Sequence, residues 1–246
     1  MTRLRYQIRN LFRTRGYEIV KISTDGRAEN LLALHSTKLF QHLGVNCVLD
    51  VGAHVGGYGS WLRNNGYAGA IVSFEPVSAN FELLERRIQG DVSWTAHRFA
   101  LGSRDENREI NVTNATNFSS FFTPTDFAHA EFGDLPTVKM TETVGVRRLD
   151  GVFAEVVPRL SNPRIYLKLD TQGWDLEVLK GASGCLDHVV AVQSEISMQA
   201  LYGGMPGFAE SIKALGDLGF TLSGLFPVVL DSSHAVIELD CVAVRK

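Results

Sequence analysis

The sequence predicts an α/β domain built on a seven-stranded, mostly parallel sheet. Apolar strand segments alternate with amphipathic helical segments over residues 47–100, and a second group of apolar segments begins at residue 165. Short links between alternating strands and helices imply right-handed crossovers and therefore parallel neighbours. Residues 221–226 and 236–244 are joined without room for a helix, so we expect an antiparallel hairpin at the C-terminal end.

The individual elements follow from periodicity and from turn residues. Leucines on one side of residues 30–43 predict a helix, and Asn65-Gly66 ends a later helix. The expected strands are 48–51, 70–74, 94–100, 165–170, 189–195, 221–226 and 236–244, and the expected helices of the core are 57–64, 79–89, 176–180 and 207–218.

Residues 105–144 interrupt the alternation with asparagine, serine and threonine interleaved with phenylalanine. Long polar insertions with aromatic residues commonly contribute a binding surface or a lid. The alternative is a surface excursion whose phenylalanines fill a minor core. We favour the binding surface.

Length and composition predict a single soluble domain of 246 residues, with 1–44 as an N-terminal helical or lid segment and 45–246 as the core. The net charge of −3 gives no reason to expect a nucleic-acid partner. Three cysteines without CxxC spacing predict reduced thiols in the cytoplasm. The sequence shows no apolar run of transmembrane length and no signal peptide.

The N-terminus differs from the rest of the chain. Basic residues interleave there with apolar residues at helical spacing, namely Arg3, Arg5, Arg9, Arg13, Arg15 and Lys21 with Leu4, Ile8, Leu11 and Phe12. Such a helix can contact an anionic membrane surface or an acidic partner. The alternative, which we favour, is a helix docked on the body with a solvated basic face.

The strand at 48–51 runs into Gly52 and Gly56, and a second strand ends at Glu75, 23 residues after Gly52. Glycine lets a backbone approach a ligand closely, and an acid about 20 residues on can bind ribose hydroxyls. The G-x-G-x-x-G of dinucleotide sites and the Gly-Lys-Ser/Thr of triphosphate sites are both missing. A nucleoside without a bound phosphate fits better, and S-adenosylmethionine is the common one. The alternative is a tight turn that needs glycine for steric reasons alone.

Further segments make the pattern more specific. They are Phe99-Ala100-Leu101-Gly102-Ser103, Asn117-Phe118-Ser119-Ser120-Phe121, and the stretch 166–182. In this order, after Asp50-x-Gly52 and Phe74-Glu75-Pro76, they resemble the FkbM family of S-adenosylmethionine-dependent O-methyltransferases over about residues 45–195. The family usually shows Asp-x-Glu-Gly-x-Glu where this chain has Asp170-Thr171-Gln172-Gly173-Trp174-Asp175. An amide thus stands where the family has its second acid.

The resemblance implies a Rossmann-like class I methyltransferase fold and a set of site residues. Asp50 and Gly52 would lie beneath the methionyl part, Glu75 would bind the ribose, and Ala100 with Leu101 would flank the adenine. The full set of expected cofactor contacts is Asp50, Gly52, Ala53, Gly56, Glu75, Pro76, Ala100 and Leu101. The expected acceptor-binding residues are Asn117, Ser119 and Ser120, and the acceptor class is a hydroxyl of a sugar, glycolipid or polyketide-type natural product.

Three residues are candidates for assisting proton removal from the acceptor. Asp170 and Glu195 end neighbouring strands, and His54 lies in the cofactor turn, where a neutral imidazole titrates usefully. Asp170 is alternatively an anchor for the methionyl ammonium. Asp170 with Glu195 could instead hold Mg²⁺ through oxygen ligands.

Two other functions remain open at this point. A non-catalytic nucleoside-binding module or partner subunit is consistent with the altered Gln172 and Asp175. A dehydrogenase-like protein is disfavoured by the missing dinucleotide motif and by the C-terminal hairpin.

Overall fold

The computed structural model describes residues 11–12, 15–17 and 31–245. The chain divides into two compact units, residues 1–39 and residues 40–246. Helix α2 (Leu31–Leu43) matches the helix expected at 30–43. Most of the predicted basic helix lies outside the described residues. None of the described helices is long and apolar enough to cross a membrane.

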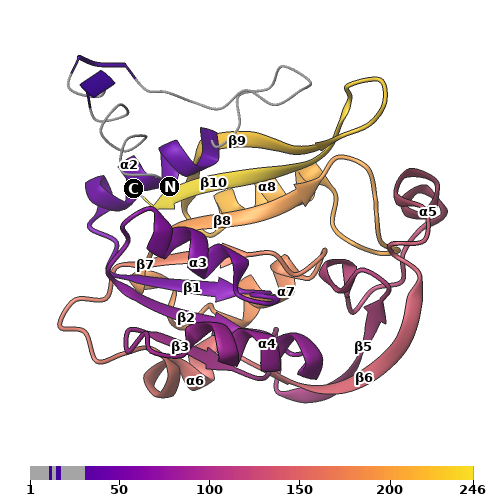
Figure 1. The fold of residues 1–246 in the computed structure, drawn as a ribbon, viewed down its shortest axis with the longest axis horizontal. Helices are drawn as coiled ribbons and strands as arrows, with labels where there is room; N and C mark the ends of the chain where they lie inside the picture. The colour runs from indigo at the N-terminus through magenta and orange to yellow at the C-terminus, as the bar shows by residue number, and fades with distance from the viewer. Residues whose placement is uncertain (1–10, 13–14, 18–30, 246) are drawn as a thin grey trace. The chain divides into compact units, whose positions relative to one another are not determined.

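Within residues 40–245, seven strands form one sheet in the order β3-β2-β1-β7-β8-β10-β9 (Figure 1). β1, β2, β3, β7 and β8 pair in parallel, whereas β10 runs antiparallel to both β8 and β9. The strands are β1 (Cys47–Val51), β2 (Ala70–Phe74), β3 (Trp94–His97), β7 (Ile165–Leu169), β8 (Val189–Ser197), β9 (Phe220–Leu230) and β10 (Val236–Arg245). The predicted fold class and the antiparallel C-terminal pair are confirmed.

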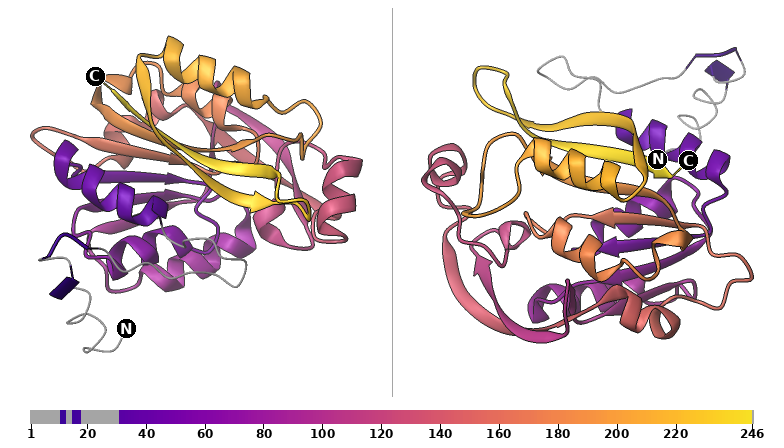
Figure 2. Two further views of the ribbon diagram at one scale, coloured as in Figure 1. Left: turned by 90° about the horizontal axis from the view of Figure 1, so that it is seen from above. Right: turned by 180° about the vertical axis from the view of Figure 1, so that it is seen from behind.

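Helices cover both faces of this sheet. α3 and α4 lie on one face, and α6, α7 and α8 lie on the other (Figure 2). Their bounds are α3 (Gly57–Asn64), α4 (Ser78–Ile88), α6 (Leu149–Val156), α7 (Asp175–Gly181) and α8 (Phe208–Asp217). α8 shows why they pack there: Ser211 and Leu215, four residues apart, are its buried positions, and the stripe they form faces the sheet.

The central strands are buried along their whole length. All five residues of β1 and all five of β7 are buried, as expected for parallel strands covered by helices on both faces. Two of these buried residues are charged, Asp50 and Lys168, and they are partners in the β1–β7 register. Burying this pair next to the strand ends is the first structural sign of a functional site.

The insertion, together with the short strand before it, forms a second sheet in the order β4-β6-β5. Its elements are β4 (Ala100–Leu101), β5 (Glu106–Thr113), the 3-10 helix η1 (Thr116–Phe118), α5 (Asp126–Phe132) and β6 (Val138–Arg147). The single strand expected at 94–100 is therefore wrong: β3 ends at His97, and Ala100 pairs with Val146 of β6 instead. Helix α6 was also not predicted.

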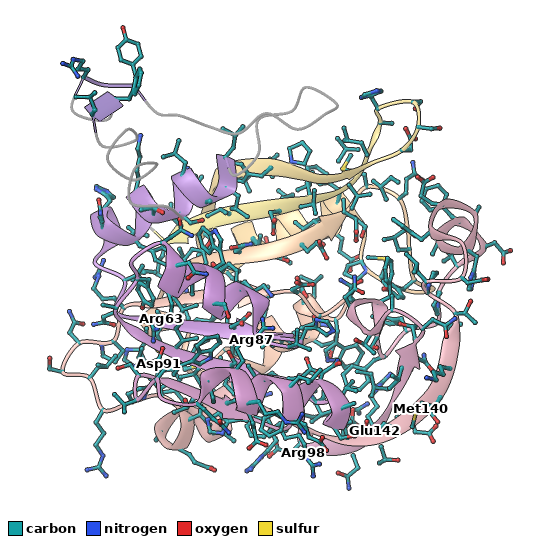
Figure 3. All side chains as sticks on the ribbon, viewed as in Figure 1. Arg63, Arg87, Asp91, Arg98, Met140 and Glu142 are labelled. Carbon is teal, nitrogen blue, oxygen red and sulfur yellow. The ribbon has the colours of Figure 1, made fainter. Side chains whose placement is uncertain are left out.

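The small sheet is tied to the start of α4. The Glu142 carboxylate on β6 accepts hydrogen bonds from the Ser78 backbone N–H, at 3.2 Å from each oxygen, and from the Ser78 hydroxyl at 3.1 Å. Figure 3 shows Glu142 and Met140 on this strand. A carboxylate at a helix N-terminus satisfies free N–H groups and the helix dipole. This contact fixes the insertion close to Glu75, which lies three residues before Ser78.

Candidate active site

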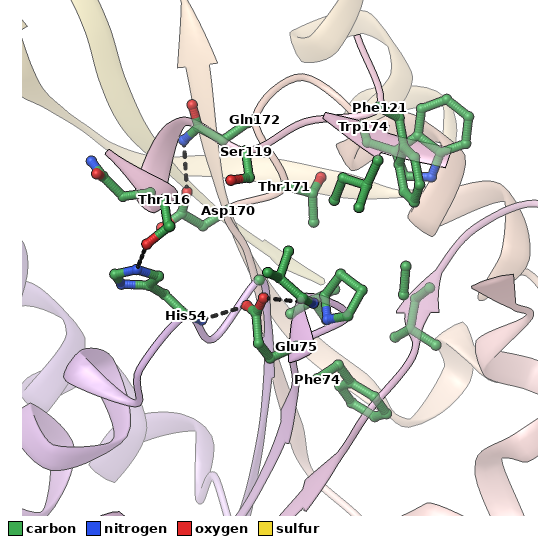
Figure 4. Close-up of a pocket in the computed structure, with 18 of the residues that line it drawn as sticks. His54, Phe74, Glu75, Thr116, Ser119, Phe121, Asp170, Thr171, Gln172 and Trp174 are labelled. Atoms are coloured by element: carbon green, nitrogen blue, oxygen red, sulfur yellow. Dashed lines mark hydrogen bonds between the residues drawn. The ribbon is translucent and has the colours of Figure 1, made fainter. Parts of the chain in front are cut away.

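A cavity of about 180 Å³, partly open to solvent, lies at the carboxyl ends of β1, β2, β7 and β8 (Figure 4). In doubly wound sheets this edge is where ligands bind. The insertion supplies the rest of its wall. The lining residues are Val51, Gly52, His54, Phe74, Glu75, Pro76, Val77, Ala100, Leu101, Ile110, Thr116, Asn117, Ser119, Phe121, Asp170, Thr171, Gln172, Trp174 and Glu195.

Glu75 directly follows β2, and its carboxylate accepts three hydrogen bonds. Oε2 accepts from the His54 backbone N–H at 2.8 Å, and Oε1 accepts from the Val77 N–H at 3.0 Å and from Asn80 Nδ2 at 3.2 Å. Because the side chain is only 4% exposed, burial raises the Glu75 pKa to about 7 despite these bonds. A carboxylate has about four lone-pair sites, so Oε2 keeps capacity for a ligand hydroxyl.

The glycine turn after β1 leaves no room for a side chain. Gly52 has φ +76, and a Cβ there would lie 1.9 Å from the Asp170 carbonyl oxygen. The Gly52 and Ala53 N–H groups both donate to the Phe74 carbonyl at 3.0 Å. The turn therefore joins the ends of β1, β2 and β7. Ala53 and Gly56 shape this turn without lining the cavity.

Lys168 holds two aspartates together beneath the cavity. Its Nζ lies 3.2 Å from Asp50 Oδ1 and 3.1 Å from Asp170 Oδ2. Burial opposes the charge on Lys168, but the two aspartates outweigh it and raise the Lys168 pKa. Burial likewise opposes the charge on Asp170, but Lys168 and further hydrogen bonds lower the Asp170 pKa. Asp50 is fully buried and does not line the cavity, whereas Asp170 does.

Gln172 links the ends of β7 and β8. Its Nε2 donates to Asp170 Oδ1 at 3.1 Å and to Glu195 Oε2 at 3.0 Å, and its Oε1 accepts from the Tyr202 hydroxyl at 2.6 Å. Burial and the Asp170 charge raise the Glu195 pKa well above its usual value. The two carboxyl groups therefore differ: Lys168 and hydrogen bonds favour the charged form of Asp170, whereas burial and the Asp170 charge favour the neutral form of Glu195.

The donor set at this pair does not fit a bound Mg²⁺. An N–H donor lies between the two carboxyl groups, and the other Asp170 oxygen is taken by Lys168. Magnesium requires oxygen ligands in octahedral geometry. Among the described residues, no three His, Cys, Asp or Glu side chains are grouped so that they could hold a metal ion.

His54 faces the same cavity from the β1 turn. Its backbone is left-handed, with φ +50, and its Nε2 lies 2.7 Å from the Thr116 hydroxyl of η1 (Figure 4). Burial lowers the His54 pKa below 6.5, partly offset by the Asp170 charge. The imidazole is therefore neutral at pH 7 and can accept a proton.

The insertion closes the cavity over its apolar end. Ala100 and Leu101 line it together with Phe121 and Trp174, whose rings lie 4.9 Å apart, and Arg108 lies over the Trp174 ring at 4.5 Å. This apolar slot suits a flat base.

The predicted acceptor residues of the insertion fall into two groups. Asn117 and Ser119 line the cavity. Ser120 is buried instead, and its hydroxyl donates to the Gln172 carbonyl at 2.7 Å.

Sequence reasoning did not assign several residues that the structure brings to the site. They are Val77, Ile110, Thr116, Phe121, Lys168, Thr171, Trp174 and Tyr202, and no structural role was assigned to Gln172. A signal existed for one of them, because Lys168 is a lone lysine inside an apolar strand and ends up level with Asp50. Tyr202 carried no such signal, since its contact with Gln172 spans 30 residues.

The family described as "Methyltransferase FkbM domain" matches residues 50–222. The chain belongs to this family. It is therefore an S-adenosylmethionine-dependent methyltransferase. The resemblance drawn from the motifs is confirmed. None of the curated proteins compared matches the chain.

Solved structures with a similar fold include proteins with bound S-adenosylmethionine. Fibrillarin of Aeropyrum pernix, in complex with S-adenosylmethionine, is 12% identical with a TM-score of 0.46, over 81% of this chain and 66% of that chain. Magnesium protoporphyrin IX methyltransferase of Synechocystis PCC 6803 is 11% identical with a TM-score of 0.43, over 100% and 99%. Precorrin-6y C5,15-methyltransferase of Geobacter metallireducens is 11% identical with a TM-score of 0.45, over 92% and 94%. The chain thus spans just under two thirds of the fibrillarin chain.

Proposed function

We propose that this methyltransferase transfers the methyl group to a hydroxyl oxygen of a sugar, glycolipid or polyketide-type natural product. The observation that carries the proposal is the His54 imidazole, which lines the cavity with a pKa lowered by burial and with its Nε2 2.7 Å from the Thr116 hydroxyl. A hydroxyl acceptor must lose its proton as it attacks, and a neutral base at that place can take it.

Bound S-adenosylmethionine would supply an electrophilic methyl group on a sulfonium. Formation of the oxygen–methyl bond would break the carbon–sulfur bond and release S-adenosylhomocysteine, and His54 would take the hydroxyl proton. Asp170, kept ionised by Lys168 and Gln172, would lie at the acceptor end of the cavity, where its charge favours the protonated form of His54. Glu75 holds the ribose through Oε2. Asp170 suits a base poorly, because Lys168 and hydrogen bonds lower its pKa although burial opposes its charge.

Polar groups beside His54 favour an oxygen-rich acceptor. Asn117, Ser119 and Thr116 line the cavity on the insertion side, and Gln172 with Glu195 lines it on the sheet side. Side chains of this kind hydrogen-bond to hydroxyls and to ring oxygens. They support a polyhydroxylated acceptor.

The test is transfer of labelled methyl from S-adenosylmethionine to a panel of sugars, glycolipids and macrolides with free hydroxyls, read by mass spectrometry. His54→Asn is the matching variant, because asparagine tolerates the left-handed backbone at this position. We expect its kcat to fall by about 10²-fold or more while cofactor affinity is kept. Unchanged turnover would remove His54 as the base.

A nucleoside-binding module remains the second candidate, favoured by the amide at Gln172 in place of an acid. Binding of S-adenosylmethionine without methylation of any acceptor would support this candidate. Calorimetry separates the two questions, since it measures cofactor binding without an acceptor.

We also propose a cytoplasmic enzyme that reaches lipid-linked acceptors through its basic N-terminus. Five arginines fall within residues 1–15, and such a segment is attracted to anionic lipid. Co-sedimentation with phosphatidylserine vesicles should occur at low salt and weaken at high salt. Removal of residues 1–15 should abolish it, and full-length protein that stays in the supernatant at low salt would contradict the proposal.

A further inference from the structure

The Asp170–Glu195 pair raises a question of charge, because Asp170 is ionised and Glu195 takes part in the same hydrogen-bonded group. Two carboxyl groups at the ends of adjacent parallel strands repel each other when both are charged. Sites of this kind are stabilised by a proton, by a cation or by hydrogen-bond donors. The structure shows which of these this chain uses.

The amide of Gln172 supplies the donors. One nitrogen carries two hydrogens, and each is directed to a different carboxyl group, at 3.1 Å from Asp170 Oδ1 and 3.0 Å from Glu195 Oε2. On the other side, Lys168 Nζ lies 3.1 Å from Asp170 Oδ2. Positive ends of an amide and an ammonium therefore occupy the directions from which a divalent cation would approach Asp170.

The orientation of this amide is fixed by its own partners. The Tyr202 hydroxyl lies 2.6 Å from Gln172 Oε1 and 3.1 Å from the Phe118 backbone carbonyl, and its proton, directed along the shorter contact, turns the NH₂ group toward the acids. The backbone carbonyl of Gln172 accepts a hydrogen bond from the Ser120 hydroxyl at 2.7 Å, which holds the backbone that carries this amide. The backbone at Gln172 is left-handed, with φ +52, a conformation that costs free energy for a side chain other than glycine and persists only where contacts enforce it.

We propose that Gln172, with Lys168, takes the place of a divalent cation and positions Asp170 against Glu195, so that this methyltransferase needs no metal. Gln172 acts as a positioning residue, through the two acids rather than on the methyl group. The proposal rests on the function proposed above, which places both acids at the acceptor end of the cavity. It implies that one substitution, Gln172→Glu, creates a cation site from three carboxyl groups.

Cation binding can be measured without an acceptor, so its outcome is independent of the acceptor chemistry. The probe is Mn²⁺, followed by electron paramagnetic resonance and calorimetry in the wild type, in Gln172→Glu and in the matched double variant Gln172→Glu/Glu195→Gln. The double variant restores an amide and two acids at the same three positions. Binding of S-adenosylhomocysteine and the thermal transition serve as checks that each variant folds.

We expect no specific Mn²⁺ site in the wild type, a site in Gln172→Glu that binds at least about tenfold more tightly, and loss of that site in the double variant. Folded Gln172→Glu that binds no Mn²⁺ would overturn the proposal. A specific Mn²⁺ site in the wild type would overturn it independently of any variant, because the amide would then have turned its oxygen toward the ion.

A kinetic readout tests the positioning role once an acceptor is found. Gln172→Met keeps the length of the side chain and removes both donors. We expect kcat to fall at least about tenfold with little change in the KM for S-adenosylmethionine, and wild-type activity to be indifferent to EDTA. A kcat equal to that of the wild type, or activity lost with EDTA and restored by Mg²⁺, would overturn the assignment.

Discussion

The two halves of the cavity are held together over different distances along the chain. In the cofactor half, Glu75 is fixed by groups from His54, Val77 and Asn80, all within 21 residues of it. In the acceptor half, Gln172 is fixed by Ser120 and by Tyr202, at separations of 52 and 30 residues.

This difference indicates which part of the family's sequence motif is more tightly constrained by the fold. The cofactor half binds one invariant ligand with a short, self-contained motif, and here it keeps the expected glycine and acid. The acceptor half is assembled from an insertion and a distant loop, so its residues can change together while the fold stays the same. Gln172, the departure from the family pattern, lies there.

The largest expected effect comes from the turn that joins the two halves. In Gly52→Ala the added Cβ would meet the Asp170 carbonyl at 1.9 Å, at φ +76, so β1 and β7 must move apart. We expect unfolding to become easier by about 3 kcal/mol or more in denaturant titrations. Gly66→Ala is the control, since its φ is +86 but nothing lies within 4 Å of the new atom, and it should cost only about 1 kcal/mol. Equal losses of unfolding free energy in the two variants would show that the turn at Gly52 does not hold β1 and β7 together.

The next largest effect is expected in the acceptor half. Asp170→Asn keeps the shape of the side chain and removes the charge that Lys168 and Gln172 hold. Methyl transfer should fall by at least about 10²-fold, in the range for a lost charged group at a reacting centre. Asp187→Asn, at an exposed site in η2, should leave the rate unchanged. Wild-type turnover in Asp170→Asn would exclude Asp170 from the mechanism.

The cofactor half is tested by Glu75→Ala. A hydrogen bond to a charged group contributes about 1.5–3 kcal/mol, so S-adenosylmethionine affinity measured by calorimetry should fall about 10- to 100-fold. Glu85→Ala, exposed on α4, is the matched control and should bind normally. An unchanged affinity in Glu75→Ala would refute the placement of the ribose.

A smaller effect is expected in the pH dependence of S-adenosylmethionine affinity. Burial raises the Glu75 pKa to about 7, so this carboxyl group gains a proton as the pH falls below that value. The neutral form accepts hydroxyl protons less well, and affinity for S-adenosylmethionine should therefore be level above pH 8 and weaken below pH 7, by at most about tenfold per pH unit. The same titration in Asn80→Leu should have its midpoint at higher pH, because Asn80 stabilises the charged form. A flat profile across pH 5–8 would contradict the role of the Glu75 charge.

Much of the fold could be predicted because alternation and turn glycines are local. The strand before Gly52, the strand before Glu75 and the final hairpin all followed from patterns within ten residues. The small sheet was not predicted, since the first half of β6 is mostly exposed and polar and shows no apolar face. The residues of such a strand carry little sequence signal, because its pairing depends on how the rest of the insertion folds.

The same distinction holds for the candidate site. Glu75 and Asp170 could be placed from sequence because strand ends meet at one edge of a parallel sheet. Ser120 could be found as part of a motif, but its contact with the Gln172 carbonyl could not, because that contact depends on how the insertion folds back. Tyr202 lies in a loop without a motif, and only the folded chain brings it to Gln172.

The most direct test of the account is a crystal structure with S-adenosylhomocysteine bound. We expect the ribose hydroxyls within hydrogen-bond distance of Glu75 Oε2, the adenine between Leu101 and Phe121, and the sulfur facing the side where His54 and Asp170 line the cavity. A nucleoside bound elsewhere, or bound here with its ribose away from Glu75, would contradict the division of the cavity into a cofactor half and an acceptor half.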